Sequence, residues 1–392
     1  MQNIKSILLS ALILVITSCG GGGGSSSPTP TPATIISGIA SAGIIKGGTV
    51  KIFTSYSSLT GADKKQLGNT VQSSLNDGYY SVNIGYYTGP VIVEVTGGSY
   101  VDEATGTTVL GGIPSTAPLR AAMGNVSGAV NISVTPLTEL AVKQAKALDK
   151  KLGAASLNKA NGQISDLFKV DIIATKPLDA SNSINTGTSE QKDYTLILAA
   201  ISQLAKSSAQ TLDTTLTGLV GNIDNTGIMN AVAGDNVKTA LSNFIADGTN
   251  NKTGVSSISD NLKIIGKTTL RLTIALTGSG VKSVETILNL PPHVTVPSDS
   301  TNTNAPLEGY LSQLINGTNT YLGGNVSSVN ALHVILNNGD QHFTMPVGDI
   351  IMVKVIVDAG FAPPDINAFT LNNTKLKDGN GVIVNGANII LH

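Results

Sequence analysis

The spacing of apolar residues changes twice along this 392-residue chain, and the changes divide it into three folded segments. Over residues 34–116, β-branched and aromatic residues alternate with small polar ones, as in "TGPVIVEVTGG", which is typical of half-buried strands. Over 117–266 the spacing becomes helical, and over 267–392 strand patterns return. We therefore expect a multidomain protein with a β-sandwich, then an α-helical bundle, then a second β-sandwich of the jelly-roll type.

The helical segment carries two start signals. Thr135 precedes Pro136, which suits an N-cap followed by proline at the first helical position. Thr188 and Gln191 have the spacing of a capping box. Apolar residues follow at helical spacing in three stretches, and we expect these stripes to form the core of the bundle.

Residues 1–18, "MQNIKSILLSALILVITS", combine Lys5 with an apolar run of about ten residues from Ile7 to Ile16. That run is too short to cross a ~30 Å hydrocarbon core as a helix and suits a secretory signal peptide. The segment ends in Ile16-Thr17-Ser18-Cys19, which resembles the lipobox of bacterial lipoproteins. The resemblance implies cleavage between Ser18 and Cys19, diacylglycerol on the Cys19 sulfur, and a fatty acyl chain such as palmitate on its new amine.

The residue after the cysteine is Gly20, where an aspartate would imply retention in the inner membrane. The lipoprotein resemblance therefore implies lipid anchoring in the outer membrane of a Gram-negative bacterium, facing the periplasm or the cell surface. Residues 19–33 are rich in Gly and Ser and then in Pro and Thr, so we expect a flexible, lipidated tether reaching at most ~50 Å.

Charge and cysteine content exclude several classes of partner. Charged residues are 12% of the chain and the net charge is −1, so we expect no nucleic-acid partner and no electrostatic footprint for an anionic membrane surface. A single cysteine excludes an intramolecular disulfide and a cysteine-based metal cluster. We expect no cofactor besides the covalent lipid on Cys19, although Asp378–Gly381 and the run from Ser298 offer oxygen ligands for calcium.

Catalytic motifs fail on order or context. Ser189–Lys192, Lys252–Gly254 and Ser259–Asn261 match the three motifs of serine β-lactamases, but the last two occur in the wrong order and only seven residues apart. The four histidines, all in the last segment, match no zinc motif. We expect no catalytic residue, no metal ligand and no enzyme activity.

Two tyrosine pairs form the one concentrated aromatic feature: Tyr79 and Tyr80, then Tyr86 and Tyr87. Neighbouring residues of a strand point to opposite faces, so one tyrosine of each pair is expected in the core and the other at the surface. The four together are a candidate binding surface, with sandwich packing as the plainer explanation.

Two segments resemble known sandwich families. Asp77, Gly78 and Tyr80, followed by Gly89 to Val95, resemble the carboxypeptidase-regulatory-like or prealbumin-type sandwich. The strand pair from Val284 to Val296, with "ALHVILNN", "GDIIMVKVIVDAG" and "FTLNNTKLKDGNG", resembles the cohesin-like sandwich. These resemblances imply modules that act as spacers or as binding platforms for a protein or a polysaccharide.

The sequence thus favours a membrane-anchored envelope lipoprotein that binds or scaffolds a protein or polysaccharide without catalysis. An envelope hydrolase acting on polysaccharide or peptidoglycan is the alternative, because scattered acids acquire their separation only in the fold. A structural spacer is the third hypothesis.

Overall fold

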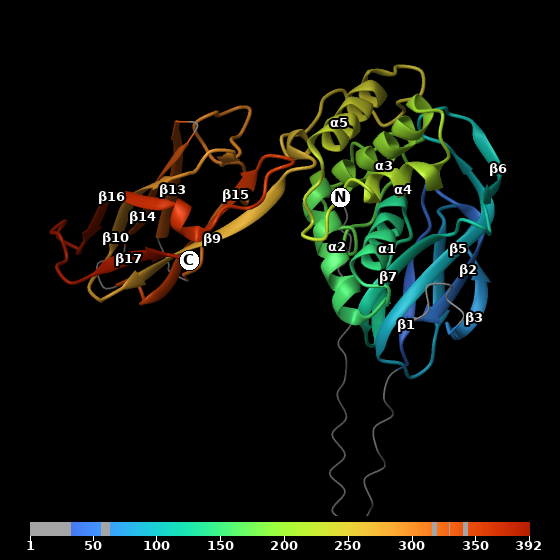
Figure 1. The fold of residues 1–392 in the computed structure, drawn as a ribbon, viewed down its shortest axis with the longest axis horizontal. Helices are drawn as coiled ribbons and strands as arrows, with labels where there is room; N and C mark the ends of the chain where they lie inside the picture. The colour runs from blue at the N-terminus through green and yellow to red at the C-terminus, as the bar shows by residue number, and fades with distance from the viewer. Residues whose placement is uncertain (1–32, 56–62, 316–319, 329, 340–343) are drawn as a thin grey trace, which may run out of the picture. The chain divides into compact units, whose positions relative to one another are not determined.

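A computed structural model describes residues 33–55, 63–315, 320–328, 330–339 and 344–392. The predicted order of strands, then helices, then strands is confirmed (Figure 1). The leader and the tether, with Ser18 and Cys19, lie outside the described residues. Within the described ranges, no helix combines the length and the apolar character that a bilayer span requires.

Two sheets form the first part of the fold. The three-stranded sheet has the order β4-β1-β8, and in the other β2 lies between β3 and β5 while β6 and β7 both pair with β5. The strands are β1 (Ile35–Ile39), β2 (Lys46–Thr54), β3 (Gln66–Gln72), β4 (Tyr79–Asn83), β5 (Gly89–Val101), β6 (Thr108–Ile113), β7 (Leu119–Val126) and β8 (Ala129–Asn131). Residues of both sheets share one buried cluster, so the two sheets pack face to face.

Strands β7 and β8 lie beyond residue 116, in the segment expected to be helical. β7 pairs with the first half of β5 and β6 with the second half, while β8 joins β1 in parallel. The sequence of β7, "LRAAMGNV", fills its alternate positions with Ala and Gly, which give a weak strand signal. The sheets therefore extend past the expected boundary.

Five helices follow: α1 (Pro136–Leu148), α2 (Ala154–Phe168), α3 (Ser189–Ser207), α4 (Leu212–Val220) and α5 (Ala231–Ala246). The two predicted start signals are confirmed. Thr135 caps α1 in a capping box completed by Thr138, and Thr188 caps α3 in a capping box with Gln191. Ile92 and Ala122 on β5 and β7 pack against α1 and α2, so these helices cover part of the face of the larger sheet opposite the small sheet.

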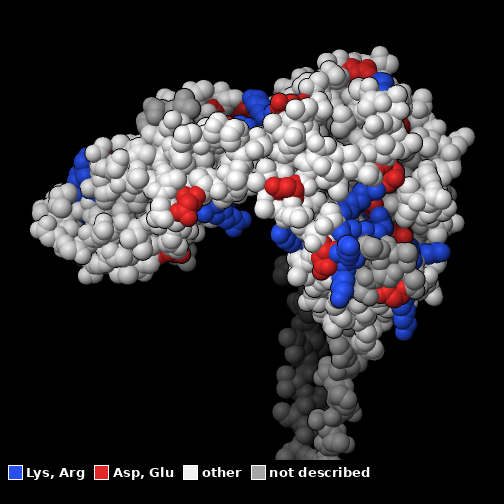
Figure 2. Space-filling view, viewed as in Figure 1, with Lys and Arg blue, Asp and Glu red and all other residues white. Residues whose placement is uncertain are grey.

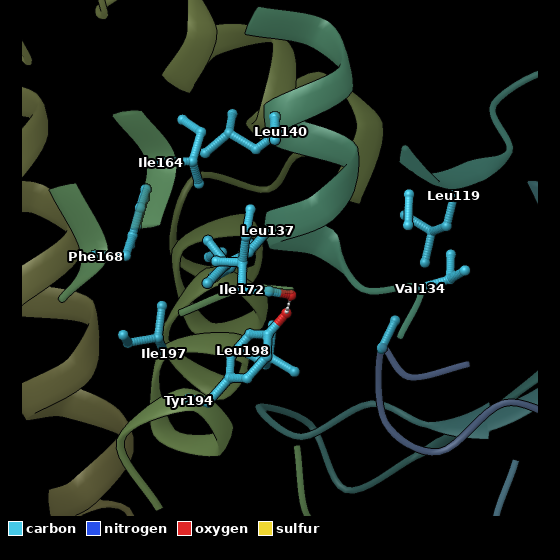
Figure 3. Close-up of a cluster of buried hydrophobic side chains, with 14 of the residues drawn as sticks. Leu119, Val134, Leu137, Leu140, Ile164, Phe168, Ile172, Tyr194, Ile197 and Leu198 are labelled. Carbon is cyan, nitrogen blue, oxygen red and sulfur yellow. Dashed lines mark hydrogen bonds between the residues drawn. The ribbon is translucent and has the colours of Figure 1, made fainter. Parts of the chain in front are cut away.

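The sheets and the helices share one hydrophobic core. Its buried residues run from Ile36 on β1 to Ile265, beyond the last helix. Tyr194 on α3 is fully buried, and its hydroxyl lies 2.8 Å from Thr135 Oγ1 and 3.3 Å from the Ile172 carbonyl oxygen (Figure 3). Strands and helices of residues 34–265 therefore form one packed unit, here called the N-terminal module, in place of a separate sandwich and bundle.

The C-terminal sandwich begins at residue 268. One sheet has the order β13-β14-β10-β16, and the other has β11-β15-β9-β17 with β12 also on β15. Both sheets contribute to a second hydrophobic cluster. The strands are β9 (Thr268–Thr277), β10 (Ser283–Asn289), β11 (Val294–Thr295), β12 (Leu311–Gln313), β13 (Thr320–Ser328), β14 (Ala331–Asn338), β15 (Gly348–Val357), β16 (Thr370–Lys377) and β17 (Asn388–Leu391).

Candidate functional site

The outer face of the β13-β14-β10-β16 sheet gathers polar side chains on four rigid strands. Along β10, residues 284, 286 and 288 are buried in the sandwich, whereas Glu285 and Ile287 point outward and are partly exposed. Register places Glu285 opposite Lys375 of β16, and Ile287 opposite His333 of β14. These side chains, with Tyr321 of β13, are here called the sandwich face.

Glu285 is the centre of an ion-pair cluster on this face. Its Oε1 lies 3.2 Å from His333 Nε2, and Lys375 Nζ lies 3.3 Å from both carboxylate oxygens. The hydrogen bond from Lys375 lowers the pKa of Glu285, and His333 adds to the effect. The three side chains remain 29–50% exposed, so their remaining hydrogen-bonding capacity faces solvent.

A β-bulge in β16 shapes the surface beside this cluster. The register slips by one residue between Glu285 and Ile287, and Asn373 takes a left-handed φ of 53° there. The buried Thr286 hydroxyl lies 2.9 Å from Thr374 Oγ1 across the bulge. The result is a depression of about 540 Å³ lined by Glu285, Ile287, His333, Asn373, Thr374 and Lys375.

Tyr321 adds an aromatic surface to the same face. It is 66% exposed, and its ring lies so close to Gly323 that a Cβ there would come within 2.9 Å of ring atoms. Gly323 is opposite the half-buried Ile335 of β14. An exposed ring on the same face as hydrogen-bonding charged groups is suited to reversible, non-covalent recognition.

The first tyrosine pair lies on β4 and alternates as a strand should, whereas Tyr86 and Tyr87 lie in the loop between β4 and β5. Tyr80 is buried and donates its hydroxyl to the Ile132 carbonyl, whereas Tyr79 is 43% exposed. Tyr87 is half-buried, with its hydroxyl donating to the Pro90 carbonyl, and Tyr86 is 70% exposed. Burial raises the pKa of both Tyr80 and Tyr87. Two of the four residues are therefore held inside the module, and only Tyr79 and Tyr86 present rings outward.

The β-lactamase-like motifs take part in ordinary structural contacts. Thr253 is buried, and its hydroxyl donates to Asn251. Ser259 Oγ accepts from the Leu262 backbone amide, and Asn261 donates to the Lys169 carbonyl. Such contacts are typical of turns and helix ends.

The histidines lie apart from one another where the structure describes them. His293 stacks on Phe361 with ring centroids 3.6 Å apart, and His392 Nε2 lies 2.9 Å from Asp349. His342 lies outside the described residues. Among the residues that are described, no group of three or more His, Cys, Asp or Glu side chains is arranged to hold a metal ion.

One buried acid stands out in the N-terminal module. Glu103 follows β5, is 8% exposed and accepts a 2.5 Å hydrogen bond from the Gly43 amide. Burial raises its pKa to about 7. It lines a pocket of about 210 Å³ with Asp102, Ser202 and Lys206, but Ser202 and Lys206 are already hydrogen-bonded to the Asp102–Ala104 turn. The arrangement holds the turn against α3.

The structure turns His333 away from Leu332 and Val334, which are buried in the sandwich. Sequence reasoning did not select His333, Glu285, Lys375 or Tyr321 as binding residues. The alternation in "SVETILN" already places Glu285 outward, but the pairing of β10 with β16, almost ninety residues away, brings Lys375 to it.

Comparison with known proteins gives little family information. No family model matches the chain, and no curated protein matches it. A solved structure described as type II cohesin A11 from Bacteroides cellulosolvens aligns at 13% identity over 30% of this chain and 81% of that one, with a TM-score of 0.24. A TM-score this low does not establish a shared fold, so the sandwich is assigned from its own strand pairing.

Proposed function

We propose that this chain is a lipid-anchored lipoprotein of the outer membrane that binds a protein partner, without catalysis, through the sandwich face. The observation that carries the proposal is the exposed cluster of Glu285, His333 and Lys375, with Tyr321 on the same face of four paired strands. Strands hold these side chains in fixed register, so a partner meets a preformed surface and little order has to be created on binding.

The chemistry of the face suits a protein contact. Tyrosine is enriched among the residues that contribute most to binding at interfaces. Glu285 can accept hydrogen bonds and Lys375 can donate them, while Ile287 and Ile335 supply apolar area between the charged groups. The sequence resemblance to cohesin-like sandwiches leads to the same expectation, a surface that holds a partner.

Capture of partners from an envelope extract by the full chain tests the proposal. The double variant Glu285→Gln/Lys375→Gln keeps the net charge and removes the ion pair, so we expect at least a tenfold loss of captured partner. The matched control is Asp235→Asn/Lys238→Gln, which removes a 2.7 Å surface pair on α5. Equal capture by both variants and the wild type would refute the role of the sandwich face.

A polysaccharide partner is the second candidate, and the position of the Tyr321 ring over Gly323 favours it. Sugar rings stack on exposed aromatic rings. On a glycan array, Tyr321→Phe should then bind as the wild type does and Tyr321→Ala should not. Tyr86→Ala, which removes an equally exposed ring on the other module, is the control.

The anchor has a separate test. Cys19→Ala should abolish acyl labelling in cells and leave an uncleaved precursor. Labelling that persists in this variant would refute the lipoprotein assignment whatever the sandwich face binds.

A further inference from the structure

Cations gather on the face of the larger N-terminal sheet that is turned away from the small sheet. Register aligns Lys51 of β2, Glu94 of β5 and Arg120 of β7 in one row across three strands. Lys64 forms an ion pair with Glu94, and its Nζ lies 4.2 Å from the centroid of the Phe53 ring. Three cations thus surround one carboxylate on this part of the sheet.

Helix α1 adds further cations beside the row. Arg120 binds Glu139 of α1 through two hydrogen bonds, of 2.9 Å and 2.5 Å, and Lys143 Nζ lies 3.9 Å from the same carboxylate. Lys146 lies one turn further along the helix. Burial lowers its pKa to about 8, and repulsion from Arg120 and Lys143 contributes. Lys146 is therefore still mostly charged at neutral pH.

These residues define a basic face: Lys51, Lys64, Arg120, Lys143 and Lys146 around Glu94 and Glu139. Its net charge is +3, and flanking cations (Lys65, Lys150, Lys151) balance flanking acids (Asp63, Asp149, Asp213). The whole chain carries −1, so the rest of it carries −4. Figure 2 shows Lys and Arg gathered where β2, β5, β7 and α1 lie in Figure 1. The expectation of no footprint for an anionic surface holds for the total charge but not for this face.

The described chain begins at the same end of the sheet as Lys65. Thr34 Oγ1 donates to the Tyr87 carbonyl, and the Tyr87 hydroxyl donates to the Pro90 carbonyl. The Pro90 carbonyl also accepts from the Ser55 amide, next to Thr54, whose amide donates to the Lys65 carbonyl. Residue 34 therefore lies at the same end of the module as Lys65, the neighbour of Lys64 in the basic face, although β1 itself belongs to the small sheet.

We infer that the basic face lies against the anionic phospholipid headgroups of the membrane that holds the lipid anchor. The choice of a membrane as the ligand of the basic face rests on the proposed lipid anchor at Cys19. Lysines near an anionic bilayer are attracted to it, and a basic surface together with acyl chains provides the paired signals of stable membrane attachment.

Sedimentation with phospholipid vesicles tests the inference without the lipid. The chain from Gly20 to His392 contains every residue of the hydrophobic clusters and carries no anchor. We expect it to bind vesicles containing about one third phosphatidylglycerol and not vesicles of phosphatidylcholine alone. Each lysine near the surface is worth about fivefold in affinity, so Lys51→Gln/Lys64→Gln/Lys146→Gln should lower binding on the order of a hundredfold at low salt.

The control variant Lys192→Gln/Lys238→Gln/Lys252→Gln removes the same charge from other parts of the module and should keep nearly full binding. Equal loss in both variants, or equal binding to neutral and anionic vesicles, would overturn the inference. Binding to soluble polygalacturonate but not to anionic vesicles would also overturn it, since the face would then take an acidic polysaccharide. Thermal unfolding of each variant checks that it is folded. The variant Glu285→Gln/Lys375→Gln should leave vesicle binding unchanged, so the vesicle result can be separated from a failure of partner binding at the sandwich face.

Discussion

Replacing Glu103 with glutamine should make the protein more stable at neutral and alkaline pH. The folded-state pKa of Glu103 is about 7 because burial disfavours its charged form, against 4.5 as the ordinary value. Between these values the folded state binds more protons than the unfolded state, so the free energy of unfolding falls as pH rises. The stabilisation from protonated Glu103 is complete below about pH 4.5 and lost above about pH 7. Over this range the free energy of unfolding falls by about 3 kcal/mol, at 1.36 kcal/mol per pKa unit.

The amide introduced by Glu103→Gln keeps an acceptor for the Gly43 backbone N–H and cannot ionise. Urea unfolding should therefore show Glu103→Gln close to wild type at pH about 5 and up to about 3 kcal/mol more stable at pH about 8. Glu308→Gln, which changes an exposed acid, is the matched control and should follow the wild type at both pH values. If the free energies of wild type and Glu103→Gln run parallel across this range, Glu103 does not ionise in the folded state with a raised pKa.

Three further changes test the packing of the N-terminal module by urea unfolding. Arg120→Met leaves the Glu139 carboxylate buried without its two hydrogen bonds and should lower the free energy of unfolding by about 3–5 kcal/mol. If Arg120→Met/Glu139→Gln recovers at least half of that stability, the unpaired buried charge is the cause. Thr135→Ala removes the α1 cap and should cost about 1–2 kcal/mol, and a change within error would contradict its capping role. Gly112→Ala should destabilise far more than Gly111→Ala, because both have positive φ but only at Gly112 would a Cβ lie 2.0 Å from the Gly97 carbonyl oxygen; equal effects would refute that close approach.

Local signals in the sequence predicted local structure well. Thr135 and Thr188 begin helices because a side-chain oxygen three residues before a free amide satisfies it, and this interaction requires nothing from the rest of the chain. The alternation of Tyr79 with Tyr80 is similarly decided within one strand.

What the sequence did not predict depends on pairing between distant segments. β7 was missed because its Ala and Gly positions pack against α1 and α2, and small residues there allow the helices to approach. The shared core of strands and helices was missed for the same reason. An apolar stripe shows that one side of a helix is buried, but it does not show which other segment covers that side. The placement of Cys19 and Ser18 remains a prediction from the lipobox alone.

The basic face shows why net charge is a poor guide to a surface. Its cations come from β2, from the residues before β3, from β7 and from α1, and each is an ordinary single lysine or arginine in the sequence. Burial is the main cause of the lowered pKa of Lys146, repulsion from Arg120 and Lys143 adds to it, and attraction to Glu139 and Glu94 opposes it. Glu139 is the least exposed of these charges, with a side chain 2% exposed, whereas Glu94 and Arg120 are each 13% exposed and Lys64 is 34% exposed. The cations Lys64 and Lys143 are more exposed than either carboxylate, so the outer part of the face is positive because the negative charges are further from any ligand that approaches.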